Sequence, residues 1–151
     1  MTAYDDMTEY RYKKSEGEVT SKNIGWLGRD SRFRTGIAPI DFVQRLEVLS
    51  CIRFNATRGI SDCPLCGERP IKNSSGQVLG SAEIKVPSDQ ERYSSPNLIL
   101  HFVVRHNYLP PENYISAVLA MSNPKSDSTR ADYEKFGVKV PEFFQDISYD
   151  W

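Results

Sequence analysis

Two cysteines and two histidines have types and spacing that could bind a metal. Cys63 and Cys66 are separated by two residues, and the only two histidines of the chain, His101 and His106, follow with four residues between them. Thiolates and imidazoles are typical zinc ligands, and a Cys-x-x-Cys turn followed by two histidines on a helix is typical of zinc fingers. The spacing therefore predicts one Zn²⁺ ion bound by all four side chains.

A zinc ion with four protein ligands is expected to be structural. Structural sites fill all four tetrahedral positions with side chains, whereas catalytic sites leave one position open for water or substrate. Binding of such an ion stabilises a fold by about 10 to 16 kcal/mol when the unfolded chain binds no metal. We therefore expect removal of zinc to unfold the centre of the protein.

Other interpretations of the same residues stay open at this point. The site could be partial or empty, or Cys63 and Cys66 could form a redox-active dithiol. His101 could instead be a buried core residue, with His106 at the surface of the helix end. Cys51 lies in an apolar helical stretch, where a small buried thiol is the simplest role.

Hydrophobic spacing and proline positions predict the helices that surround these ligands. Pro39, at a favoured first position, and the apolar residues that follow it predict a helix over 39–51. Ser95 and Pro96 predict the start of a second helix, which carries both histidines and ends near Asn107. Further helices are predicted over 111–122 and, as a short one, over 130–136.

The remaining pattern predicts a small sheet. Residues 4–14 alternate polar and aromatic side chains, which favours a short strand, and residues 15–23 are predicted to be a loop. Residues 77–86 are typical of a hairpin, which would lie between the cysteine turn and the second helix. The fold class expected is α+β, a small antiparallel sheet with about three helices and, at its centre, a zinc-finger-like knuckle, an enlarged hairpin and a helix.

One geometric conflict follows from the histidine spacing. Side chains five positions apart lie about 140° apart around an ideal α-helix, so His101 and His106 cannot both aim at one point from an undistorted helix. We therefore expect the helix to loosen at its end, where Asn107 and the Pro110-Pro111 pair would stop it.

Length and composition predict one domain of ordinary size. The chain has 151 residues, a net charge of −1 and 39% hydrophobic residues, which can fill a modest core. It divides into an N-terminal strand or loop (1–23), a zinc-supported core (24–122) and an acidic, aromatic C-terminal segment (123–151). The sequence contains no apolar run long enough to span a membrane and no secretory signal pattern, so we expect a cytoplasmic protein.

The common catalytic motifs are missing. The cysteine pair precedes the histidines, unlike the order in zinc deaminases, and Phe102 follows His101 where a zinc protease has glutamate. The sequence has no P-loop, nucleophile elbow or dinucleotide-binding glycine pattern. We therefore expect neither catalysis nor a small-molecule substrate.

Several short motifs are shared with a known group of sequences. They include Gly25-Trp26-Leu27, the Phe33-x-Thr35-Gly36 turn, Pro39 with Phe42, Arg58-Gly59 before the cysteines, Glu83 to Pro87, Tyr93 with Pro96, and the block from His101 to Pro111. By these motifs, over about residues 24–120, the chain resembles a family of small, uncharacterised bacterial proteins with a CxxC…HxxxxHxYxPP pattern. The resemblance implies bacterial origin and the Cys-Cys-His-His ligand set, and it implies no activity. Where members often carry a histidine before the Phe-x-Thr-Gly turn, this chain has Ser31.

Two functions from different classes fit these features. The first is a non-catalytic interaction protein that neutralises a bacterial toxin or docks on another protein, using acidic and aromatic side chains. The residues predicted to bind such a partner are Tyr133, Glu134, Phe136, Glu142, Phe144, Asp146, Tyr149, Asp150 and Trp151. For any one of these aromatic residues, a place in the protein's own core is an equally good interpretation.

The alternative function is nucleic-acid binding supported by zinc. Residues 22–72 carry nine basic and five acidic groups, a net charge of +4, and Trp26 or Phe33 could stack on bases. The basic residues predicted for this role are Arg29, Arg32, Arg34, Arg53, Arg58 and Lys72. The net negative charge of the whole chain disfavours this alternative, because phosphate binding requires positive charge.

Overall fold

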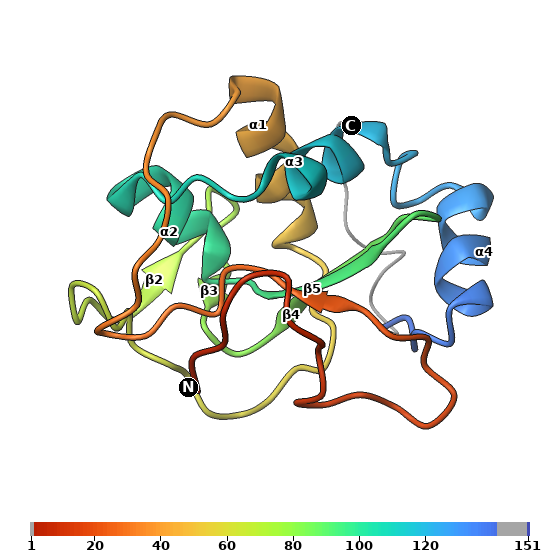
Figure 1. Ribbon diagram of the computed structural model, residues 1–151, viewed down its shortest axis with the longest axis horizontal. Coiled ribbons are helices and arrows are strands. Elements are labelled where there is room, and N and C mark those ends of the chain that lie inside the picture. The colour runs from red at the N-terminus through yellow and green to blue at the C-terminus, as the bar shows by residue number, and fades with distance from the viewer. Residues whose placement is uncertain (1, 142–150) are drawn as a thin grey trace.

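The computed structural model describes residues 2–141 and 151 and has the expected α+β architecture (Figure 1). Among these residues, no helix combines the length and the hydropathy needed to cross a bilayer. The elements in chain order are β1 (Lys22–Asn23), α1 (Ile40–Leu49), β2 (Ile71–Lys72), β3 (Val78–Leu79), β4 (Glu83–Pro87), β5 (Arg92–Pro96), α2 (Ile99–His106), α3 (Glu112–Ala120) and α4 (Asp127–Lys135).

The strands form two small sheets. The first has the order β1-β5-β4, with β4 antiparallel and β1 parallel to β5, so this sheet is mixed where the sequence predicted an antiparallel one. The second pairs β2 with β3 in antiparallel register. The short β2–β3 sheet follows the cysteine turn in the chain and holds the C-terminal side of that turn in place.

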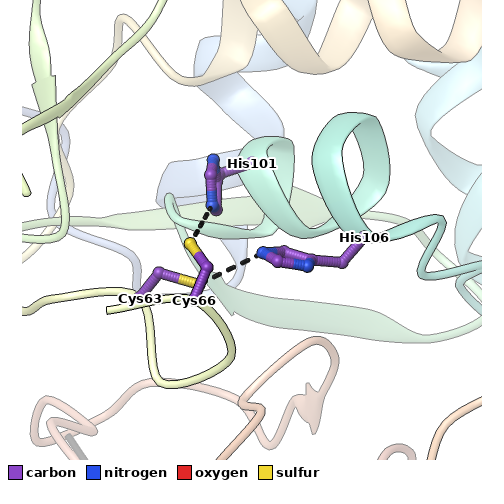
Figure 2. Close-up of side chains that lie close together, drawn as sticks. All are labelled: Cys63, Cys66, His101 and His106. Atoms are coloured by element: carbon purple, nitrogen blue, oxygen red, sulfur yellow. Dashed lines mark hydrogen bonds between the residues drawn. The ribbon is translucent and has the colours of Figure 1, made fainter. Parts of the chain in front are cut away.

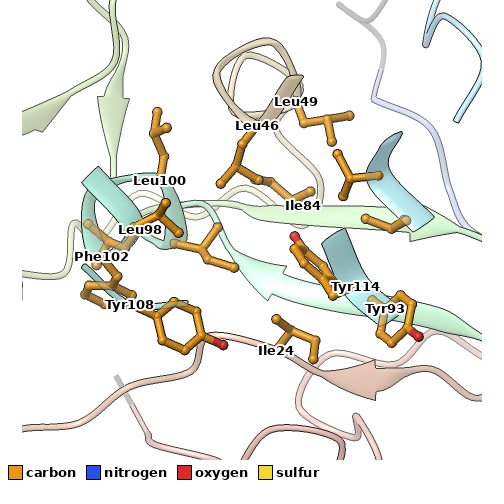
Figure 3. Packing of buried hydrophobic residues seen from close by; sticks show 14 of the residues in the cluster. Ile24, Leu46, Leu49, Ile84, Tyr93, Leu98, Leu100, Phe102, Tyr108 and Tyr114 are labelled. Atoms are coloured by element: carbon orange, nitrogen blue, oxygen red, sulfur yellow. The ribbon is translucent and has the colours of Figure 1, made fainter. Parts of the chain in front are cut away.

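The helices cover the first sheet and enclose one hydrophobic core. Helices α1 and α3 lie side by side above the sheet, with α2 and α4 toward opposite ends (Figure 1). Leu46 and Leu49 of α1 point toward Ile84 of β4, and Tyr114 of α3 lies beside Tyr93 of β5 (Figure 3). All five of these side chains are buried. Phe102 of α2 belongs to the same buried cluster, so the helix that carries both histidines is anchored by the same core as the sheet.

Two helix starts were predicted correctly from the positions of prolines. Helix α1 begins one residue after Pro39 and α3 one residue after Pro111, close to the predicted ranges 39–51 and 111–122. The described residues contain four helices, because the short helix predicted over 130–136 is a full helix, α4, capped by Ser126. The Ser126 hydroxyl accepts a hydrogen bond from the Thr129 amide, which satisfies one free amide of the first turn.

The predicted start of the second helix was wrong by three residues. Ser95 and Pro96 end strand β5, where Pro96 lies opposite Glu83, and α2 begins only at Ile99. Serine followed by proline is common before a helix, but proline is also tolerated where a strand has a free edge, and β1 pairs only with Tyr93 and Ser94 of β5. The local pattern did not distinguish these two positions.

Two strand predictions also need correction. Residues 4–14 form no strand, although Glu9 makes an isolated bridge with Lys22, and β1 falls in the predicted loop 15–23. The predicted hairpin over 77–86 is divided, because β3 pairs backward with β2 while β4 pairs forward with β5. Gly80, with φ of +98°, makes the turn between them, a backbone conformation that glycine adopts readily.

Candidate metal centre

The Cys63–Gly67 segment folds as a tight turn that holds its first sulfur in a fixed place. The Gly67 amide donates to the Cys63 carbonyl at 2.7 Å, and the Leu65 amide donates to the Cys63 Sγ at 3.4 Å. Gly67 has φ of +72°, which favours glycine. Cys63 is buried in the core cluster, whereas Cys66 is exposed. The turn therefore joins the hydrophobic core to the protein surface.

The last turn of α2 is widened at the position of His106. After this residue, the amides of Asn107 and Tyr108 both donate to the carbonyl of Phe102, five and six residues back, instead of the four of a regular helix. Asn107 ends the helix in the left-handed conformation, with φ of +53°. The two imidazole centroids lie 5.0 Å apart. The chain is thus widened directly after His106, at the helix end where the sequence predicted loosening.

The four predicted ligands converge on one point (Figure 2). His106 Nε2 lies 3.5 Å from Cys63 Sγ, and His101 Nε2 lies 3.5 Å from Cys66 Sγ. One ligand atom from each of the four residues lies within 4.8 Å of the other three. These side chains can therefore hold a single metal ion, with the cysteine turn on one side and the end of α2 on the other.

The surroundings favour the metal-binding form of the histidines. Burial lowers the pKa of both imidazoles, and for His101 the neighbouring His106 lowers it further. Both shifts favour the neutral imidazole, which offers a lone pair to a metal. Burial raises the pKa of the Cys63 thiol, so a bound cation is needed to hold it as the thiolate. Ligands of this composition suit a soft or borderline divalent cation.

The third cysteine lies outside this cluster. Cys51 is buried at the end of α1, and its sulfur accepts a hydrogen bond from the Asn73 amide nitrogen at 3.5 Å. The interpretation of Cys51 as a structural thiol agrees with this position.

The residues predicted to bind a protein partner are divided by the structure. Tyr133 is fully buried and donates to the Lys85 carbonyl at 2.8 Å, and Phe136 is also buried, so neither is available to a partner. Both close the protein's own core, the other interpretation given for them above. Glu134 is exposed. Glu142, Phe144, Asp146, Tyr149 and Asp150 lie outside the described residues.

Trp151 packs against the protein itself. Its indole N–H donates to the Met121 carbonyl at 3.0 Å, and the Arg45 guanidinium lies over its ring, 4.5 Å from the centroid. The same guanidinium donates to the carbonyls of Val118, Leu119 and Met121 at the end of α3. Trp151 therefore joins the end of the chain to α1 and α3.

The basic and aromatic residues predicted for nucleic-acid binding have different surroundings in the structure. Arg53 and Arg58 line one shallow cleft together. Arg34 donates to the Pro110 carbonyl, and Arg29, Arg32 and Lys72 are exposed elsewhere. Trp26 is buried, with its indole N–H bonded to the Ser94 carbonyl, and Phe33 packs on the Tyr108 ring. The Trp26 ring is therefore closed to a base, whereas Phe33 is partly exposed.

A second polar cluster was not found from the sequence. The Lys85 ammonium is buried between two buried carboxylates, 3.4 Å from Glu18 Oε2 and 3.3 Å from Glu83 Oε1. It also donates to Ser94 Oγ at 2.9 Å and lies over the Tyr10 ring, 3.8 Å from the centroid. Only the charged residues at 83 and 85, in an otherwise buried strand, hinted at this network, because its other members are distant in the sequence.

Comparison with known proteins identifies a family and no characterised relative. No curated protein and no solved structure matches the chain. A family model does match residues 2–119, which include the N-terminal segment, β1 to β5, α1, α2 and almost all of α3, and exclude α4 and Trp151. The chain belongs to the family described as Domain of unknown function (DUF7919).

Proposed function

We propose that the protein is a non-catalytic interaction domain whose fold is held by one structural Zn²⁺ ion. The observation that carries this proposal is the convergence of four protein ligands, Cys63, Cys66, His101 and His106, on one point. Four side chains complete a tetrahedral shell, so no position is left for a substrate or an activated water. The metal would then join two segments that are 35 residues apart at their closest ligands.

Two of the distances between ligand atoms fit zinc. Zinc–sulfur bonds of about 2.3 Å and zinc–nitrogen bonds of about 2.0 to 2.1 Å at a tetrahedral angle separate sulfur from nitrogen by about 3.6 Å. The two sulfur–nitrogen pairs, Cys63 with His106 and Cys66 with His101, are both 3.5 Å apart. An S₂N₂ set of this shape is typical of zinc and excludes the oxygen-rich shells of calcium and magnesium.

Exposed apolar side chains support an interaction role. Ile37, Ile40 and Val104 have exposed fractions of 93%, 76% and 62%. The loop that carries Ile37 runs beside the residues after α2, because the Gly36 amide donates to the Asn107 carbonyl at 2.9 Å. Contiguous apolar patches mark contact sites between proteins, and Ile37 and Ile40, three positions apart, are the candidates for such a patch here. The toxin-neutralising form of this function stays a prediction, because most of its acidic and aromatic residues lie between 142 and 150, outside the described part of the chain.

The closed metal site is tested by substitution of cobalt for zinc. Co²⁺ in a four-coordinate S₂N₂ site gives intense visible absorption bands and a sulfur-to-metal charge-transfer band. We expect this spectrum at one equivalent of Co²⁺, and we expect added azide to leave it unchanged. A spectrum that shifts with azide would reveal an open coordination position and would favour a catalytic metal instead.

The interaction role is tested by photo-cross-linking in cells. A benzoylphenylalanine residue in place of Ile40 should give one discrete cross-linked product, and the same residue in place of the exposed Lys139 is the control. Excess wild-type protein should suppress the product, whereas a competitor with Ile37→Ser should not. Products of equal intensity from both positions would contradict an interface at Ile37 and Ile40.

A further inference from the structure

The segment between β1 and α1 contains a short extended stretch, residues 33–37, that pairs on one side. It passes the end of α2 before it enters α1 (Figure 1). Thr35 forms an isolated antiparallel bridge to the residues after α2. On either side of this bridge, the Arg34 carbonyl and the Gly36 amide make hydrogen bonds to 107–109, of 2.8 Å and 2.9 Å. We call residues 33–37 the 33–37 edge.

The other side of the 33–37 edge has no partner among the described residues. Backbone N–H and C=O groups of successive residues in an extended segment point to opposite edges. Because residues 34 and 36 face 107–109, the backbone groups of Phe33, Thr35 and Ile37 face the opposite side. None of these groups makes a hydrogen bond within the described part of the chain. Thr35 is exposed and Ile37 is 93% exposed, so this side is open to pairing with another strand.

Side chains already hold the 33–37 edge in position. The Arg34 guanidinium donates from Nη2 to the Pro110 carbonyl at 2.5 Å. The Phe33 ring packs edge-on against the Tyr108 ring, with centroids 5.7 Å apart. An edge that is ordered in advance loses little conformational entropy when a second strand pairs with it.

The sequence of the 33–37 edge is complementary to itself in one antiparallel register. When two copies pair with Thr35 at the centre, Thr35 lies opposite Thr35, and Phe33 lies opposite Ile37. These are the residues whose backbone groups face outward, so each copy offers the N–H and C=O groups that this register exchanges. Pairs of threonines, and pairs of an aromatic with a β-branched residue, stabilise neighbouring strands.

The charges at the two ends fit the same register. The N-terminal end carries Arg29, Asp30 and Arg32, a net charge of +1, and the C-terminal end is followed by Asp41. Antiparallel pairing brings the N-terminal end of one copy toward the C-terminal end of the other. Arg29, Arg32 and Asp41 have no ion-pair partner among the described residues. Arg34, near the centre, is bonded within its own chain.

We propose that two copies of this chain associate through the 33–37 edge, paired antiparallel about a twofold axis at Thr35. A twofold dimer requires a surface that is complementary to itself, which this edge provides. The inference rests on the proposed interaction function, because it places the exposed Ile37 in the interface and names the partner as a second copy. So short an edge is far below the roughly 20 to 30 residues per side of a standard interface, so the dimer is weak.

The test is sedimentation equilibrium of the full chain as purified. We expect monomer at about 1 μM and a growing fraction of dimer toward about 1 mM. A chain that is still monomeric at about 1 mM would overturn the inference. That result would leave the proposed function standing, because cross-linking from Ile40 detects a partner of any kind.

Variants on the edge locate the contact. Thr35→Pro removes an outward amide that makes no bond within the described residues and should raise the dimer dissociation constant by about tenfold or more. Ile37→Lys places a charge on the open edge and should do the same. Val19→Lys is the matched control and should leave the constant unchanged, because Val19 is also exposed and lies beside Phe136, away from the edge.

Two outcomes decide between this edge and another surface. An unchanged dissociation constant in a folded Thr35→Pro protein would contradict pairing through the edge. If circular dichroism shows that Thr35→Pro does not fold, Ile37→Lys decides in its place, because this side chain is almost wholly exposed.

Cysteine variants test the register. Paired residues at the twofold axis have Cα atoms about 5.5 Å apart, within the range of a disulfide, so Thr35→Cys should give a cross-linked dimer with oxidised glutathione. Ile37→Cys would lie about 14 Å from its counterpart, because Ile37 pairs with Phe33, and should give little product. The wild type, which keeps the exposed Cys66, measures the background. Equal yields from the two variants would contradict a twofold axis at Thr35.

Discussion

The metal centre and the Lys85 network differ in the cation that would neutralise their polar groups. Each brings together polar groups from distant parts of the chain. The network supplies its own cation, Lys85, inside a sheet whose strands β4 and β5 are almost wholly buried. The cysteine turn has no such cation, and most residues of 56–70 around it are exposed. In the proposed function, the ion provides at the cysteine turn the stability that packing provides in the sheet.

The comparison predicts that loss of metal is the most damaging change. Cys63→Ser should abolish stoichiometric zinc binding and lower the melting temperature by more than about 15 °C, given about 2 to 4 °C per kcal/mol for a domain of this size. Cys51→Ser, at a buried thiol outside the cluster, is the matched control and should keep full zinc content. Elemental analysis and thermal melts measure both effects. A Cys63→Ser protein that melts like the wild type would show that the turn needs no ion.

The buried ammonium is expected to matter next most. Lys85→Met leaves two buried carboxylates without their cation, which costs about 3 to 5 kcal/mol. This should lower the melting temperature by about 6 to 20 °C without loss of bound zinc. Lys135→Met removes the exposed ion pair with Asp89 and should leave the melting temperature almost unchanged. Equal effects of the two variants would contradict a network that stabilises the sheet.

Gly80 contacts the segment before Cys63 and precedes strand β4 of the Lys85 network. Its substitution tests how tightly the metal centre and the network are joined. The Ser61 amide donates to the Gly80 carbonyl at 2.8 Å, and a Cβ on Gly80 would lie 2.6 Å from the Ser61 carbonyl oxygen. Gly80→Ala should therefore cost about 2 to 4 kcal/mol and displace the segment that leads to Cys63.

Gly76→Ala provides the matched comparison for this substitution. Gly76 also has a positive φ, of +81°, but nothing lies within 4 Å of an added Cβ. Its substitution should cost only about 1 kcal/mol. Chemical denaturation measures the difference between the two variants. If both variants lose the same free energy of unfolding, the contact between residues 61 and 80 does not join the metal centre to the Lys85 network.

The smallest effect is expected at the end of the chain, outside the family match. Trp151→Phe removes the hydrogen bond to the Met121 carbonyl and weakens the contact with Arg45. We expect a loss of about 1 kcal/mol, or about 2 to 4 °C in melting temperature. Zinc content should stay at one ion per chain. A loss as large as that of Lys85→Met would mean that Trp151 belongs to the core.

The Cys-Cys-His-His cluster could be predicted from the sequence because each of its two pairs has a local signature. A Cys-x-x-Cys turn and two histidines near a helix end are recognisable by spacing alone, and the required widening of the helix followed from their angular separation. The proline-marked starts of α1 and α3 were predictable for the same reason. Each of these features is fixed by residues close together in the chain.

The features that were missed depend on contacts between distant residues. Strand β1 has two residues and exists only because it pairs with β5, some 70 positions later. Ser95 and Pro96 form a strand end because Pro96 lies opposite Glu83. The Glu18–Lys85–Glu83 network likewise has no spacing signature. Tertiary pairing decided these elements, and local patterns carry no information about it.

The most direct test of the central claim is X-ray absorption at the zinc edge of the protein purified without added metal. We expect one zinc ion per chain with two sulfur neighbours at about 2.3 Å and two nitrogen neighbours at about 2.0 to 2.1 Å, and loss of one sulfur neighbour or of the ion in Cys63→Ser. Absence of bound zinc, or a shell of oxygen neighbours, would contradict an ion that joins the cysteine turn to α2.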